Sequence, residues 1–86
     1  KTSSIYKTVA SRTNVAGYFR LRPGDILVKD GHVVLFLYYT NSFRSQVMIL
    51  QQGGRPTLNT VGCAIKSLSY YISGNGYIAR RKRSFA

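Results

Sequence analysis

The fold is decided by one stretch, residues 22–39, which reads RPGDILVKDGHVVLFLYY. Its Pro-Gly pair predicts a turn, because proline presets one backbone angle and glycine tolerates positive φ. A short apolar strand follows. Asp30-Gly31 then separates two β-rich runs, which is the pattern of a tight hairpin turn of the primed type. We therefore expect a hairpin, with one strand over residues 26–29 and a second strand that begins at His32.

The second strand of this hairpin, residues 32–39, is apolar on both alternating faces, which is typical of a central strand covered on both sides. A polar loop follows, and then a third strand over residues 46–52, which a Gly-Gly-Arg-Pro run ends. A final strand is expected at residues 77–79. Apolar residues at helical spacing predict one short helix at Val61, Ile65, Leu68 and Ile72. The expected fold class is α+β, with a central antiparallel sheet and one short helix.

The chain has 86 residues, enough for one small domain. With 44% hydrophobic and 17% charged residues, it should form a packed globular body rather than a disordered chain. We expect a single domain or fragment over residues 1–86, with a poorly defined N-terminal segment (1–20), a sheet body (21–83) and a tail (84–86). The opening residues include no initiator Met and no signal-peptide core, which is typical of a processed or excised product.

Charge is the most unusual property of the composition. Thirteen Lys and Arg residues stand against two acids, Asp25 and Asp30, which gives a formal net charge of +11. Such a chain attracts polyanions, among them nucleic acid, anionic lipid head groups and acidic cell-wall polymers. No apolar run approaches the roughly 18 residues of a membrane span. The single cysteine, Cys63, cannot form an internal disulfide, and we predict no cofactor and no bound metal.

The only histidine, His32, opens the second strand of the hairpin. A side chain at this place can be held rigidly by a sheet while its tip stays accessible. Imidazole titrates near neutral pH, so it can take a proton from a thiol and return one to a leaving amine. Read alone, a lone histidine is more often an ordinary residue at the end of a strand. The neighbouring sequence favours the catalytic role.

The neighbourhood of His32 resembles the NlpC/P60 family of cysteine peptidases and amidases. In that family a Pro-Gly-Asp turn starts one strand and Gly-His-Val starts the next, and the matching residues here are 23–25 and 31–33. Upstream, Ser11-Arg12-Thr13 is similar to the Arg-Thr segment that precedes the turn. Downstream, residues 77–81 are similar to the closing Tyr-and-Arg strand. The resemblance covers roughly residues 11–83.

The resemblance implies a papain-like half-barrel in which His32 is the catalytic base of a hydrolase that acts on peptidoglycan or related amide bonds, in a secreted or cell-envelope protein. A third polar residue on the following strand holds the imidazole in that family. Gln51 is the best matching position, and Gln52 is the second choice. A glutamine amide can accept the imidazole N–H and fix its tautomer without adding charge. Alternatively, the two glutamines merely end an edge strand.

The family's nucleophile is a cysteine at the start of a helix, well before the Pro-Gly-Asp turn, and no cysteine precedes residue 22 here. By itself, the chain is therefore expected to be inactive. Either a missing N-terminal segment or a second chain carries the nucleophilic Cys, or the domain is inactive. Cys63 offers another route, because circularly permuted relatives of this fold place the cysteine after the histidine and on a helix. However, the residues around Cys63 do not match the permuted motif.

The charge supports a competing interpretation, a small β-rich module that binds nucleic acid by phosphate neutralisation and base stacking on tyrosines. Lys29, Arg44, Arg55 and Lys66 are scattered, and only residues 80–83 form a basic run. A basic run near a terminus is more often a solvated tail. A purely structural role, as in a ribosomal protein, also fits the charge but leaves His32 and the turn motif unexplained.

Overall fold

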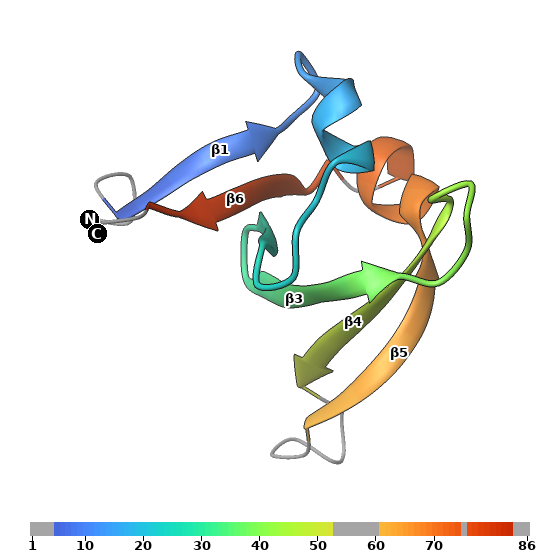
Figure 1. Cartoon of the computed structure of the whole chain (residues 1–86). Coiled ribbons are helices and arrows are strands. Elements are labelled where there is room, and N and C mark those ends of the chain that lie inside the picture. The colour runs from blue at the N-terminus through green and yellow to red at the C-terminus, as the bar shows by residue number, and fades with distance from the viewer. Residues whose placement is uncertain (1–4, 53–60, 75, 84–86) are drawn as a thin grey trace.

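The computed structural model describes residues 5–52, 61–74 and 76–83, and the chain is mostly β (Figure 1). It forms one antiparallel sheet of six strands in the order β1-β6-β2-β3-β4-β5. The remaining described elements are a 3₁₀ helix, η1, and a short π-helix, η2. In chain order the elements are β1 (Tyr6–Ala10), η1 (Val15–Phe19), β2 (Ile26–Lys29), β3 (His32–Tyr39), β4 (Gln46–Gln52), β5 (Val61–Ser67), η2 (Tyr70–Gly74) and β6 (Ile78–Lys82).

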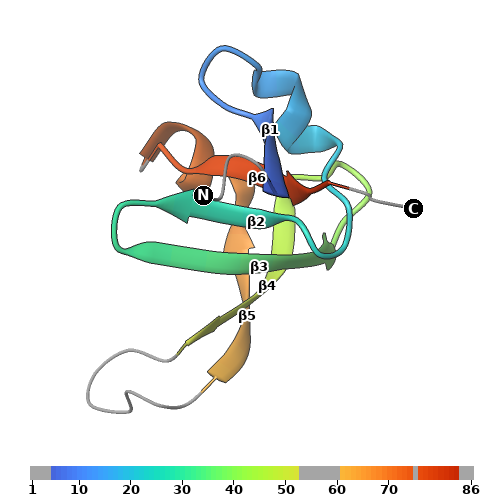
Figure 2. The same ribbon diagram turned by 90° about the vertical axis from the view of Figure 1, so that its left-hand side faces the viewer.

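The hairpin predicted from the sequence is confirmed. β2 and β3 pair antiparallel and are joined by a turn that brings Lys29 opposite His32 (Figure 2). Gly24, in the turn before β2, has a φ of +98°, a conformation that suits glycine. The predicted turn type is wrong, because of the two turn residues only Gly31 has positive φ (+76°), whereas a type I′ turn needs positive φ at both and a type II′ turn needs it at the first.

The predicted helix over residues 61–72 is wrong in its first half. Residues 61–67 form β5, which pairs along the whole length of β4, from Gln46 opposite Ser67 to Gln52 opposite Val61. Helical turns begin only at Leu68. Glycine at position 62 and the β-branched Val61 and Ile65 disfavour a helix and fit a strand. The physical reason is the free edge of β4, whose backbone groups need a partner.

Both ends of the described chain contribute strands that the sequence did not predict with these bounds. The segment before residue 21 supplies β1 and η1, so the sheet extends beyond the expected body. β6 runs over Ile78–Lys82, so it begins one residue later and ends three residues later than the expected strand at residues 77–79. It lies between β1 and β2, which means that the basic run is largely built into the sheet rather than forming a solvated tail. Antiparallel pairing on both sides of β6 holds it there.

One face of the sheet, here called the inner face, carries the core. Alternate residues of β2, β3 and β4 point to it, and η1, η2 and the residues that flank them cover it. Tyr18 of η1 donates its hydroxyl hydrogen to the carbonyl oxygen of Tyr77, and Tyr39 donates to the carbonyl oxygen of Tyr18 at 2.5 Å. The buried hydrophobic residues are Ala10, Tyr18, Leu21, Leu27, Val34, Phe36, Val47, Ile49, Leu68, Tyr71, Tyr77 and Ala79.

The opposite face, here called the outer face, is also apolar but stays partly open. Val33 is 59% exposed and Ile65 is 57% exposed, and Tyr38 and Ile78 are exposed as well. The registers place these side chains on the face opposite to the core. β3 is an inner strand of the sheet, as predicted, but the expectation that both of its faces are covered is wrong for the described residues. Its second apolar face meets solvent.

Candidate active site

His32 opens β3 directly after the turn of the β2–β3 hairpin, where it lies opposite Lys29. Its side chain is exposed. Because side chains alternate along a strand, His32 belongs to the inner face with the buried Val34 and Phe36. The sheet therefore fixes the backbone of His32, while the imidazole stands at the rim of the core with access to solvent. This is the position that a general base needs.

A groove of about 450 Å³ opens at this end of the hairpin. Besides His32, it has apolar walls from the outer face and three charged side chains. Its lining residues are Val28, Lys29, Asp30, Gly31, His32, Val33, Ile78 and Arg80. Binding sites for small groups typically combine apolar walls with a few polar groups in this way. The groove can hold a group of the size of one or two amino acids at the end of the hairpin that carries His32.

Below this groove lies a cluster of tyrosines. The Lys29 ammonium is 5.1 Å from the centroid of the Tyr77 ring, a cation–π contact. The rings of Tyr71 and Tyr77 meet edge to face at 4.8 Å. Burial, with a smaller contribution from Tyr77 and Tyr70, raises the pKa of Tyr71 to about 12. The hydroxyl of Tyr71 thus stays protonated at neutral pH, so it is not a candidate base.

Gln51, the proposed orienting residue, is half-buried near the end of β4, on the inner face with Val47 and Ile49. The paired part of β3 and β4 ends at Leu35 opposite Leu50. Beyond this pair, β4 and β5 turn away from the β2–β3 hairpin (Figure 2). His32 and Gln51 share a face, but within the described residues no hydrogen bond joins them. Gln52 ends β4, and its side chain lies outside the described part of the structure.

Cys63 lies in the middle of β5, exposed on the outer face and opposite Leu50. The hypothesis of a permuted enzyme placed this cysteine near the start of a helix, and that placement is wrong. A strand does not offer the aligned backbone N–H groups of a helix N-terminus, which activate thiols in such enzymes. Among the described residues, no three His, Cys, Asp or Glu side chains come together in a way that could hold a metal ion.

Two features escaped the sequence analysis. Asp25, which is 1% exposed, forms a salt bridge with Arg81 of β6, with 2.9 Å from the Arg81 Nε to the Asp25 Oδ1. The backbone N–H of Arg22 donates to the same carboxylate at 2.8 Å. The second feature is a cavity lined with basic side chains next to this salt bridge. The Pro-Gly-Asp turn marked Asp25 as a turn residue, but nothing local indicated its distant partner.

Compared with family models, with curated proteins and with solved structures, the chain has no significant match in any of the three. In the part of the chain that the structure describes, no helix has the length and apolar character needed to cross a lipid bilayer.

Proposed function

We propose that this chain is the histidine-bearing part of a cysteine peptidase or amidase of the NlpC/P60 kind, acting on cell-wall peptides or related amide bonds. The observation that carries the proposal is the position of His32. It opens an inner strand after a tight turn, its side chain is exposed, and it lines an open groove. The proposal includes a papain-like fold for the complete enzyme, in which the antiparallel sheet described here forms one wall.

The proposed chemistry is amide hydrolysis through a thioester. His32 removes the proton from a cysteine thiol supplied from outside this chain, and the thiolate attacks the carbonyl carbon of the amide. The same imidazole then gives its proton to the leaving amine, and water releases the acid from the thioester. Gln51 would accept a hydrogen bond from the imidazole N–H and keep the ring in the right tautomer. This requires that the end of β4 close toward His32 when the missing segment is present.

The outer face supports the need for such a segment. Its exposed apolar side chains include Val33 and Ile78, which also line the groove of His32. A helix packed on this face would cover the apolar surface, and its end would reach the groove. Large exposed apolar patches on monomers usually mark interaction sites. We therefore expect a segment that precedes the chain, or a partner chain, to pack on this face and to bring the nucleophile around the end of the hairpin to His32, whose side chain belongs to the inner face.

The test uses an extended chain that includes the residues encoded directly upstream, provided that they carry a cysteine. Amine release from a peptidoglycan stem peptide is followed over time. We expect His32→Ala to lower turnover by at least about 100-fold, the contribution typical of a general acid–base residue. Gln51→Ala should lower turnover less, because it acts through the imidazole. The control is Phe43→Ala, which removes a side chain that is 86% exposed in the loop after β3.

Full turnover in His32→Ala would overturn the proposal, as would an extended, folded chain with a free thiol that hydrolyses no stem peptide. If Gln51→Ala has no effect, the orienting role moves to another residue while the enzyme proposal stands. Phe43→Ala should retain normal turnover. A loss in this control equal to that of His32→Ala would mean that the readout reports folding rather than catalysis, and the proposal would lose its support.

A further inference from the structure

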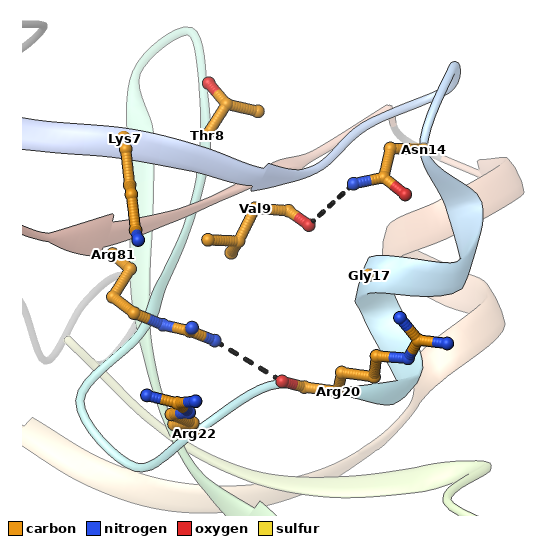
Figure 3. A pocket seen from close by; sticks show the side chains of 8 residues that line it. All are labelled: Lys7, Thr8, Val9, Asn14, Gly17, Arg20, Arg22 and Arg81. Carbon is orange, nitrogen blue, oxygen red and sulfur yellow. Dashed lines mark hydrogen bonds between the residues drawn. The ribbon is translucent and has the colours of Figure 1, made fainter.

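A second cavity, of about 370 Å³, lies between β1, η1, the segment after η1 and β6. Four of its lining side chains are cationic, and none is acidic. Figure 3 shows the ends of Lys7, Arg22 and Arg81 gathered on one side of the cavity and that of Arg20 on the other. The lining residues are Lys7, Thr8, Val9, Asn14, Gly17, Arg20, Arg22 and Arg81. Three segments that are distant in sequence thus deliver positive charge to one place.

The positive charge around this cavity is only partly balanced. Among the described residues Asp25 is the one nearby carboxylate, and it is occupied: the Arg81 Nε and Nη2 each donate to it at 2.9 Å, and the Arg22 backbone N–H donates at 2.8 Å. In the described part of the chain, the side chains of Lys7, Arg20 and Arg22 form no ion pair with an acid. Four cations against one carboxylate leave a local charge of about +3, unless an anion binds.

The sheet register makes this arrangement costly without an anion. Lys7 of β1 lies directly opposite Arg81 of β6. Like charges directly opposite each other on antiparallel strands repel and destabilise the pair. The salt bridge to Asp25 reduces this repulsion but adds no counter-charge on the cavity side of Lys7. An anion between the two side chains would convert the repulsion into two attractions.

The frame of the cavity is rigid. Gly17 of η1 packs so closely on β1 that a Cβ at this position would lie 1.9 Å from the carbonyl oxygen of Val9. The side-chain amide of Asn14 donates to the same carbonyl oxygen at 3.1 Å. Arg81 is fixed by Asp25, and its Nη2 also donates to the carbonyl oxygen of Arg20 at 3.3 Å. Arg81 is therefore a preorganised donor, and such a donor loses little entropy when a ligand binds.

From these observations we propose that this cavity binds the phosphate group of a phosphate monoester. A guanidinium presents parallel N–H donors that match the oxygens of phosphate, and three arginines face one cavity. A phosphate monoester carries close to two negative charges at neutral pH, which suits a local charge of about +3 better than a single carboxylate does. The volume leaves room for part of the molecule that carries the phosphate. A cavity ringed by cations favours one compact, highly charged group over an extended polymer backbone.

This site is distinct from the groove of His32. The cavity adjoins Asp25, just before β2 begins, whereas His32 follows the turn after β2 ends. β2 has four residues, so roughly 10 to 14 Å of strand separate the two places. The phosphate site does not depend on the proposed hydrolase activity, and its test involves no turnover. The two proposals can therefore fail separately.

The experiment is a calorimetric titration of the full chain with phenyl phosphate, followed by NMR of the arginine Nε–H groups. We expect saturable binding, and shifts confined to the arginines of the cavity. Lys7→Gln and Arg22→Gln should each weaken binding by roughly 3- to 10-fold, because each removes a charge-assisted contact from a partly exposed site. The matched control is Lys82→Gln, which removes the same charge one residue from Arg81 but on the outer face, and should change the affinity less than 2-fold.

Other ligands then test the chemical class. Benzoate, which offers a single negative charge, should bind more weakly than phenyl phosphate. A single-stranded oligonucleotide should bind more tightly with a 5′-phosphate than without one. Three results would overturn the proposal: no saturable binding of phenyl phosphate, equal weakening in Lys82→Gln and in the cavity variants, or equal affinity for the two oligonucleotides. Equal weakening in Lys82→Gln would assign the binding to the net charge of the whole chain. Equal affinity for the two oligonucleotides would assign it to the polymer backbone.

Discussion

The two ends of the β2 strand differ sharply in how their polar groups are satisfied. At the first end, Asp25 is 1% exposed, and every hydrogen bond described for its carboxylate comes from a fixed donor, either Arg81 or the backbone of Arg22. At the other end, His32 is exposed, and its side chain makes no hydrogen bond within the described residues. One end ties the turn before β2 to β6, and the other leaves a titratable side chain accessible to solvent. This difference separates a structural junction from a candidate catalytic position.

The largest expected effect comes from breaking the junction. Asp25→Asn removes the charge that balances Arg81, whose side chain is 21% exposed and still needs a partner. Loss of one partner of a buried ion pair costs about 3 kcal/mol of unfolding free energy, at the lower end for such pairs because Arg81 keeps some access to water. Urea denaturation measures the loss. The total unfolding free energy of a domain of this size equals only a few such losses.

The matched control for this junction is Asp30→Asn, which removes the same charge at the exposed turn before His32. This substitution should change the unfolding free energy by less than about 0.5 kcal/mol. If Asp25→Asn and Asp30→Asn lower stability equally, the two ends of β2 do not differ in the way proposed.

A second, intermediate effect concerns the buried tyrosine Tyr71. The pKa of Tyr71 is raised to about 12 in the folded protein, mainly by burial, against 10.0 as its ordinary value. Between these two values the unfolded chain loses the phenol proton while the folded chain keeps it, so stability falls as the pH rises from 10 to 12. The loss attributable to Tyr71 should reach about 2 kcal/mol by pH 12. It should be absent below pH 10.

Urea denaturation across this pH range, with the Tyr71→Phe variant beside the natural chain, isolates the effect. Phenylalanine keeps the ring and removes the titrating hydroxyl, so the variant should lose stability less steeply between pH 10 and 12. Identical slopes for the two proteins would show that Tyr71 ionises as readily in the folded state as in the unfolded chain, and that burial at this end is weaker than the structure indicates.

The smallest effect on stability is expected from a substitution of the exposed His32. His32→Ala removes a side chain without a hydrogen-bond partner among the described residues, so the unfolding free energy should change by less than about 0.5 kcal/mol. Combined with a large loss of turnover in the extended chain, this would mark His32 as a functional residue rather than a structural one. A loss of more than about 1.5 kcal/mol of unfolding free energy in urea denaturation would instead assign His32 a structural role, like that of Asp25.

Much of the region around His32 could be predicted from the sequence. Proline and glycine at the turns and the apolar pattern between them located β2, β3 and β4 with the bounds that the structure has. The groove residues on the hairpin follow from that prediction. The proposed hydrogen bond between Gln51 and His32 is not formed among the described residues, and the sequence could not decide it, because it depends on how far β4 stays paired with β3. The register ends at Leu50, one residue before Gln51.

Local signals determined the hairpin, the antiparallel character of the sheet and the place of His32, because turn chemistry and side-chain alternation depend only on neighbours in the chain. Tertiary structure decided the rest. Residues 61–67 became a strand because β4 offered a free edge, and residues 78–82 became an inner strand because β1 and β2 flank it. The basic cavity exists because the register places Lys7 opposite Arg81 and η1 packs on β1. These outcomes depend on pairing between residues up to 76 positions apart in the sequence, and no pattern within one segment encodes them.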